Sequence, residues 1–288
     1  MIRLDAATVL LQWATGGLLF LWVTTRRREV GIGYGWLLRG VYSAMAIGSV
    51  ATGVAFRPET GRDVCAALVA VAASTALAAS VVRRKAGVAG ERARAKRRET
   101  RVAAMTHRSG DDSPPHTGVD RPQNEFWPAL DLVAPLIGAV GLVLAGAHAG
   151  GPHGLAMVRT LVGAAFLGAV SDAMLLGHWY LVQPGLGRAP LLELVRWTAW
   201  TWPFEVAVLL WPPGMVRVLT GSIDDGWGGT LGWFWFACAA TTLILALVTR
   251  AALKERAYSA VMAATGLLYL AILTAFGTDL VARAILAG

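Results

Sequence analysis

The chain has 288 residues, of which 56% are hydrophobic and only 15% are charged, and its formal net charge is +8. A soluble domain of this size carries about a quarter charged residues, so the composition excludes an ordinary water-soluble globular protein. Long apolar stretches alternate with short basic ones, which indicates membrane topology rather than nucleic-acid binding. Cys65 and Cys238 lie in different apolar stretches without a CxxC spacing, so neither a disulfide framework nor a metal site is predicted.

Eight apolar stretches are long enough to cross a bilayer as helices, which takes about 20 residues. Backbone groups in lipid must bond internally, and these stretches lack the alternation of barrel strands. The sequence therefore predicts an all-α polytopic membrane helix bundle of about eight transmembrane helices. The predicted spans are residues 6–25, 34–56, 64–82, 127–149, 155–182, 191–212, 229–250 and 257–284.

Basic residues predict the orientation of these spans. The triplet "RRR" at 26–28 follows the first apolar stretch, so this stretch is not a cleaved signal peptide and its positive end is expected in the cytoplasm. With that orientation, 18 Lys and Arg lie in predicted cytoplasmic loops and 5 in outside segments. We therefore expect the N-terminus and the C-terminus both outside. The Arg-, Ala- and Gly-rich, Lys-poor composition is typical of a GC-rich bacterial genome, so a multi-pass protein of the bacterial cytoplasmic membrane is predicted.

The chain divides into transmembrane helices 1–3 (1–82), a basic cytoplasmic loop (83–126) and transmembrane helices 4–8 (127–288). The first half of the loop is dense in Arg and Ala and favours attraction to anionic lipid headgroups or docking of other membrane subunits. The second half, "HRSGDDSPPHTGVDRPQNEF", is typical of a flexible, partly disordered linker. The expected partners are therefore the lipid bilayer and other membrane subunits.

Ionisable residues inside membrane spans are costly and by default indicate a functional site. Six of them lie toward the predicted cytoplasmic side: Arg39, Asp131, Asp172, His178, Glu193 and Arg196. The Pro- and Gly-containing connection "QPGLGRAP" predicts that the spans at 155–182 and 191–212 are antiparallel neighbours. This would bring most of the polar groups of both spans to one level near the cytoplasmic face.

Helix geometry sorts these groups further. Glu193, Arg196 and Trp197 share one helix face, so Glu193 and Arg196 can pair directly. Asp172 and His178, which precedes Trp179, are separated by about 120° around their helix, but both could border the same gap between helices. Arg39 and Asp131 are the candidate charge partners of Asp172. The ligand-binding candidates are Asp172, His178, Glu193, Arg196, Trp179, Trp197, Asp131 and Arg39.

Known chemistries fit this set unequally. A bis-His haem needs two histidines at matched depth, and only His178 lies clearly within a span. No hydrolase, P-loop or dinucleotide motif is present, although an intramembrane enzyme using Asp172 and His178 as acid and base stays open.

Three interpretations remain. The cluster could bind a quinone or a lipid headgroup in a haem-free subunit of a respiratory membrane complex, with Trp200 as a further aromatic wall. The chain could instead be a proton-coupled small-molecule transporter. In that case the acids Asp131, Asp172 and Glu205 relay protons, Arg39 and Arg159 neutralise them, and Pro203 interrupts its helix. In the third interpretation, a non-catalytic assembly or accessory subunit, the charges are structural, as expected for the i,i+4 pair Asp279 and Arg283.

Overall fold

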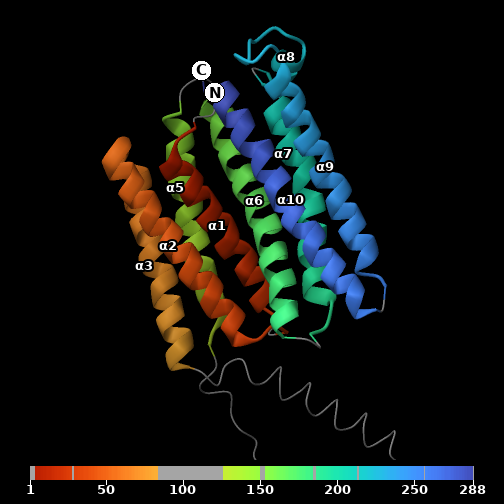
Figure 1. The fold of residues 1–288 in the computed structure, drawn as a ribbon. Coiled ribbons are helices and arrows are strands. Elements are labelled where there is room, and N and C mark those ends of the chain that lie inside the picture. Colours follow the sequence, from red (N-terminus) through yellow and green to blue (C-terminus); the bar gives the residue numbers. More distant parts are fainter. Residues whose placement is uncertain are drawn as a thin grey trace, which may run out of the picture.

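The structure is a computed structural model that describes residues 4–27, 29–83, 126–149, 153–183, 186–212, 214–255 and 257–287 as a bundle of long helices (Figure 1). No strand occurs within these ranges, so the predicted all-α bundle is confirmed. In chain order the elements are α1 (Ala6–Thr25), α2 (Ile32–Phe56), α3 (Thr60–Val82), the 3-10 helix η2 (Pro128–Leu132), α5 (Val133–Ala147), α6 (His153–Val182), α7 (Ala189–Leu210), the short α8 (Met215–Leu219), α9 (Thr230–Ala252) and α10 (Tyr258–Leu286).

Seven segments of the described chain are long and apolar enough to cross a membrane, with η2 and α5 forming one of them together. The remaining long helix, α7, has 22 residues and packs against α6 and α9. Its composition sets it apart because it carries Glu193, Arg196 and Glu205. The eight predicted spans thus correspond to seven strongly apolar helices and one more polar helix of similar length.

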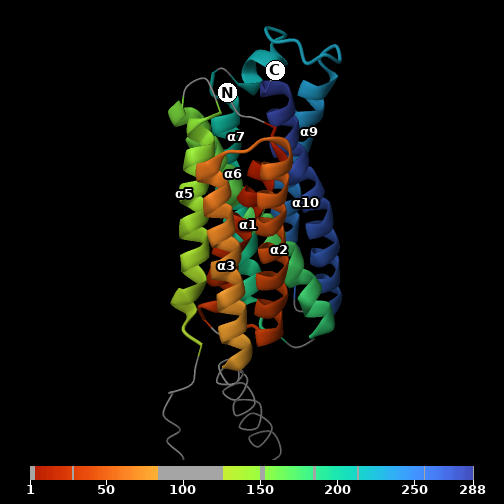
Figure 2. The same ribbon diagram turned by 90° about the vertical axis from the view of Figure 1, so that its left-hand side faces the viewer.

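The two ends of the bundle differ in the connections that they carry (Figures 1 and 2). At the upper end of Figure 1 the described chain begins and ends, α2 joins α3, and α8 lies between α7 and α9. At the lower end α1 joins α2, α6 joins α7, and α9 joins α10. Of the predicted basic loop 83–126, only Arg83 and Phe126 belong to the described residues. The predicted cytoplasmic location of the lower end stays a prediction.

Helices α1 and α6 form the centre of the bundle. Buried residues make up 67% and 72% of their most apolar stretches, against 33–44% in the other five apolar spans. Helix α1 packs against α2, α5 and α6, while α6 packs against α1, α5, α7 and α10. Polar groups on α1 and α6 are therefore screened from lipid by the surrounding helices.

Glycine permits the close approach of these two central helices. A Cβ atom on Gly16 of α1 would lie 1.8 Å from the backbone oxygen of Ala164, and one on Gly168 of α6 would lie 2.2 Å from the backbone of Gly16. Only glycine fits at such distances, as is common where transmembrane helices pack backbone to backbone. This contact fixes the relative heights of the polar residues on α1 and α6.

Candidate functional site

Asp172, on α6, is fully buried in the middle of the bundle. The hydroxyl group of Tyr42 on α2 donates a hydrogen bond to its Oδ1 atom. The hydroxyl group of Tyr34, two turns earlier on α2, donates to the backbone oxygen of Asp172 at 3.3 Å. The second carboxyl oxygen of Asp172, Oδ2, has no hydrogen-bond partner among the described residues. Asp172 is therefore bonded by hydroxyl groups and not by the predicted charge partners.

The predicted partners of Asp172, Arg39 and Asp131, bond to each other instead. The Nε and Nη2 atoms of Arg39 donate to the two carboxyl oxygens of Asp131 at 2.8 Å and 2.7 Å. Thr25 also donates to Asp131, and the Arg39 guanidinium group lies 4.6 Å from the centre of the Phe126 ring. This two-pronged geometry satisfies both charges, so neither is left to compensate Asp172. The sequence-based assignment was wrong because it matched the charges without knowing how η2 meets α2.

Glu193 also has different partners from the predicted one. Its carboxyl oxygens pair with Arg26 at 2.5 Å and with Arg27 at 3.2 Å, both in the connection after α1. Arg196 is exposed and makes no ion pair with Glu193. The direct Glu193–Arg196 pair was therefore a wrong prediction. The positive segment after α1 lies nearer to Glu193 than the arginine one turn away on the same helix.

His178 is exposed and makes its contact with α10. Its Nδ1 atom lies 3.0 Å from the hydroxyl group of Tyr269 on α10. Its neighbour Trp179 donates to the side chain of Gln183 at 3.0 Å and lies beside the ring of Tyr34. Asp172 thus bonds to α2 and His178 to α10, and no contact joins the two side chains among the described residues. The eight predicted ligand-binding residues do not form one site.

Three of those residues do meet at the lower end, in a groove beside α7. The groove has a volume of about 390 Å³. Glu193, Arg196 and Trp197 line it together with Arg27 and Trp200. The ring of Trp200 is 67% exposed, so this wall faces the surroundings of the bundle.

A second buried group lies nearer the upper end. The predicted pair of Asp279 and Arg283 on α10 is confirmed, with Nε of Arg283 donating to Oδ2 of Asp279 at 2.7 Å. Gln12 of α1 joins it, because its side-chain nitrogen donates to Asp279 at 3.4 Å and its oxygen accepts from Arg283. A Cβ atom on Gly163 would lie 2.5 Å from the Gln12 nitrogen, so glycine keeps the space for this contact.

Glu205 of α7 faces this group from the other side. It is fully buried, and Asp279, Arg283 and Arg159 are its electrostatic neighbours. Neither of its carboxyl oxygens has a hydrogen-bond partner among the described residues. The guanidinium group of Arg159 donates to the backbone oxygens of Val208 and Trp211 at 2.8 Å, at the end of α7. Arg159, which the transporter interpretation assigns to neutralising the buried acids, is therefore held at the end of α7 and is an electrostatic neighbour of Glu205.

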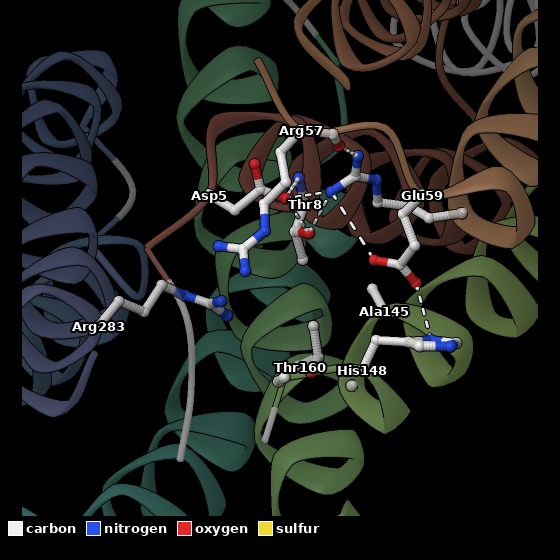
Figure 3. A pocket seen from close by; sticks show the side chains of 11 residues that line it. Asp5, Thr8, Arg57, Glu59, Ala145, His148, Thr160 and Arg283 are labelled. Atoms are coloured by element: carbon white, nitrogen blue, oxygen red, sulfur yellow. Dashed lines mark hydrogen bonds and ion pairs between the residues drawn. The ribbon is translucent and has the colours of Figure 1, made fainter. Parts of the chain in front are cut away.

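A third polar group lies at the upper end itself. The buried Arg62 of α3 pairs with Asp5 and with Asp63 and also donates to the backbone oxygen of Arg57. Beside it, His148 pairs with Glu59 at 3.1 Å (Figure 3). A small cavity opens between these side chains and Arg283.

Sequence reasoning missed the tyrosines that hold Asp172 and the glutamine that joins α1 to α10. A signal for the tyrosines was available, because Tyr34, Leu38 and Tyr42 follow at intervals of four on α2 and share one helix face. A similar signal was available on α1, where Asp5, Thr8 and Gln12 follow at intervals of three and four. These hydroxyl and amide groups carry no charge, so a search for ionisable residues alone could not find them.

Comparisons of the chain with protein-family models, curated proteins and solved structures find no match. The fold and its buried groups define the class: this is a multi-pass helical membrane protein.

Proposed function

We propose that this protein is a proton-coupled small-molecule transporter in which Asp172 binds and releases the transported proton. The observation that carries the proposal is the setting of Asp172. It is fully buried between central helices, and among the described residues it has no charged partner and is bonded only by tyrosine hydroxyl groups. An unpaired carboxylate is very costly to bury, so such a group favours the neutral, proton-bearing form. Carboxyl groups of this kind are the usual proton carriers of pumps and transporters.

Further polar groups extend from Asp172 toward the upper end. Ser171 accepts a hydrogen bond from the indole of Trp13 at 2.8 Å. Gln12 directly precedes Trp13 on α1, and its side chain bonds to Asp279 in the upper buried group. Gly163, which contacts Gln12, precedes Asp172 by nine residues, or about 13 Å along the helix. Asp172 and the upper acidic group therefore occupy two successive levels of one bundle, as a stepwise proton path needs.

Two other buried groups, the one around Arg39 and the one around Arg62, fit structural roles. Arg39 and Asp131 bond directly to each other, and Arg62 bonds directly to its acidic partner Asp63, so these charges are compensated within the bundle. Asp131 is thereby removed from the set of predicted proton-carrying acids. Helix α7 also continues through Pro203, so the predicted interruption is absent. The proposal accordingly rests on Asp172 and Glu205, not on a broken helix.

Proton entry into liposomes tests the proposal. Purified protein is reconstituted with a trapped pH-sensitive dye, and a potassium diffusion potential drives protons inward. The assay is run alone and with a panel of amino acids, carboxylates, amines and sugars. We expect entry above that of protein-free liposomes, and we expect Asp172→Asn to abolish the excess. Asp224→Asn, at an exposed position in the loop before α9, is the matched control and should behave as wild type.

Two results would overturn the proposal: no excess proton entry under any condition, or equal entry in wild type and Asp172→Asn. In either case the interpretation as an accessory subunit with structural charges would be preferred.

The groove beside α7 favours a second candidate function, the binding of a quinone or an anionic lipid headgroup. Arg27 and Arg196 can donate to carbonyl or phosphate oxygens, and the two tryptophans provide aromatic walls. His178 and Asp172 lie elsewhere and are not part of this candidate site. The test is co-purification of a lipid or quinone followed by mass spectrometry. Loss of the bound molecule in Arg196→Gln, but not in the control Arg217→Gln, supports it, and equal retention contradicts it.

A further inference from the structure

The cavity at the upper end is a small polar space between five elements of the bundle (Figure 3). Its volume is about 20 Å³, which is enough for a water molecule. Charged and hydroxyl side chains make up most of its wall: Asp5, Thr8, Arg57, Glu59, Arg62, His148, Thr160 and Arg283. Such a lining offers a water molecule the hydrogen-bond partners that it needs.

Arg283 connects this cavity to the buried acids. Its side chain lines the cavity although it is only 1% exposed, and Figure 3 shows its guanidinium group pointing into the same space as that of Arg57. On its other side Arg283 donates to Asp279 at 2.7 Å. Glu205 is the next acid, in electrostatic contact with Asp279 and with Arg283. One side chain thus separates the cavity from a pair of carboxyl groups.

The two acids, Glu205 on α7 and Asp279 on α10, are both fully buried. Asp279 is ion-paired with Arg283, whereas neither carboxyl oxygen of Glu205 has a hydrogen-bond partner among the described residues, so Glu205 is the acid whose neutral, proton-bearing form burial favours. The charged groups that face the two acids are Arg283 from α10 and Arg159 from α6, while Gln12 faces them from α1 without charge. A proton bound by Glu205 changes the net charge of this group by one, and the polar route described above leads past Arg283.

The mouth of the cavity carries titratable and charged groups as well. Glu59 and His148 pair at 3.1 Å, and the side chain of His148 is 66% exposed. Arg62 forms a fixed wall because Asp5 and Asp63 hold it. The cavity therefore has one wall fixed by the ion pairs of Arg62 and one wall, at His148, that is exposed to the medium.

We propose that this cavity is the aqueous entry through which Glu205 exchanges a proton with the medium at the upper end. A hydronium ion in the cavity gives its proton to the Glu205 carboxylate, which becomes a neutral carboxyl group, and is left as water; the reverse step forms hydronium again. Arg283 keeps its own protons, and by changing hydrogen-bond partners it lets a cavity water reach the carboxylate. The role of this exchange in transport rests on the proposed function, but the exchange itself can be measured separately.

The test blocks the cavity and measures proton exchange directly. In a background of Cys65→Ala and Cys238→Ala, a single cysteine replaces Ala149, a half-buried residue of the cavity wall. It is labelled with a negatively charged methanethiosulfonate reagent. Infrared spectroscopy after transfer to D₂O then follows the carboxylic acid C=O band that Glu205→Gln removes. We expect exchange at least about tenfold slower after labelling, with recovery after reduction of the label. Ser222→Cys, exposed at the same end but outside the cavity, is the matched control.

Two outcomes overturn the inference. One is the absence of any carboxylic acid band that depends on Glu205, and the other is an equal exchange rate with and without the label on Ala149→Cys. The liposome assay separates this inference from the proposed function. If labelling slows exchange while proton entry into liposomes is absent, the cavity is an entry to Glu205 but the protein is not a proton-coupled transporter.

Discussion

Asp172 and Asp131 are both buried carboxyl groups, but their surroundings differ. Asp131 receives two hydrogen bonds from the guanidinium group of Arg39, so its negative charge is satisfied inside the bundle. Asp172 receives one hydrogen bond from Tyr42 at its carboxyl group and has no charged partner among the residues that the structure describes. The same residue type is therefore charge-paired in one place and, in the proposed function, binds a proton in the other.

Breaking the Arg39–Asp131 pair should destabilise the fold. Arg39→Ala leaves Asp131 buried without its partner, and we expect a loss of about 3–5 kcal/mol in the free energy of unfolding. Denaturant unfolding in mixed micelles measures this loss. The double variant Arg39→Met with Asp131→Leu removes both charges and should lie much closer to wild type. A single variant within about 0.5 kcal/mol of wild type would mean that the pair does not stabilise the bundle.

At the scale of elements, the close contact between α1 and α6 determines whether the polar residues of the two helices lie at matching heights. Gly16→Ala would place a Cβ atom 1.8 Å from the backbone oxygen of Ala164, so the two helices must move apart. We expect a loss of about 1–3 kcal/mol in unfolding free energy. Gly266→Ala on α10 is the control, because a Cβ atom there meets nothing within 4 Å. The control should equal wild type or exceed it by up to about 1 kcal/mol, and equal stability of both variants would contradict the close contact.

The loop before α9 is held by Asp225, whose carboxylate accepts from the backbone N–H groups of Trp227, Gly229, Leu231 and Gly232. Desolvation alone would raise the pKa of Asp225, but the four donors outweigh it and the pKa is lowered. A lowered pKa means that this contribution to stability is present above the unfolded value of about 3.9 and is lost as pH falls through the folded value.

Hydrogen exchange of these amides tests the role of Asp225. We expect protection that is constant above about pH 5 and lost in more acidic solution, and weak protection at every pH in Asp225→Asn. Asp224→Asn, whose carboxylate accepts only from Gly226, should leave the other amides protected. Protection that persists in Asp225→Asn would show that the carboxylate does not hold the loop.

For the whole molecule, the predicted orientation can be tested by cysteine labelling in intact cells. In the background of Cys65→Ala and Cys238→Ala, an impermeant maleimide should label Ser222→Cys from outside. It should label Ser109→Cys, in the predicted cytoplasmic loop, only after the membrane is permeabilised. The reverse pattern would invert the bundle and place the cavity of Figure 3 on the cytoplasmic side.

The sequence was sufficient to predict the helices but not the partners of their charged residues. The observed boundaries differ from the predicted ones by at most four residues, because span length and apolar composition are local properties. The Asp279–Arg283 pair was equally predictable, since both residues belong to one helix. Glu193 instead pairs with Arg26 in the connection after α1, and Asp172 bonds to Tyr42 on α2. Each of these partners lies more than 120 positions away along the chain. Such contacts depend on how whole helices pack, and spacing along one helix carries no information about them.

The most direct test of the central claim is the protonation state of Asp172 itself. Infrared difference spectra between wild type and Asp172→Asn should contain the C=O band of a protonated carboxylic acid. Tyr42→Phe should shift that band, because the hydroxyl group of Tyr42 bonds to this carboxyl group. A difference spectrum without a carboxylic acid band at any pH between about 5 and 9 would show that Asp172 holds no proton in the folded protein, and would contradict the account.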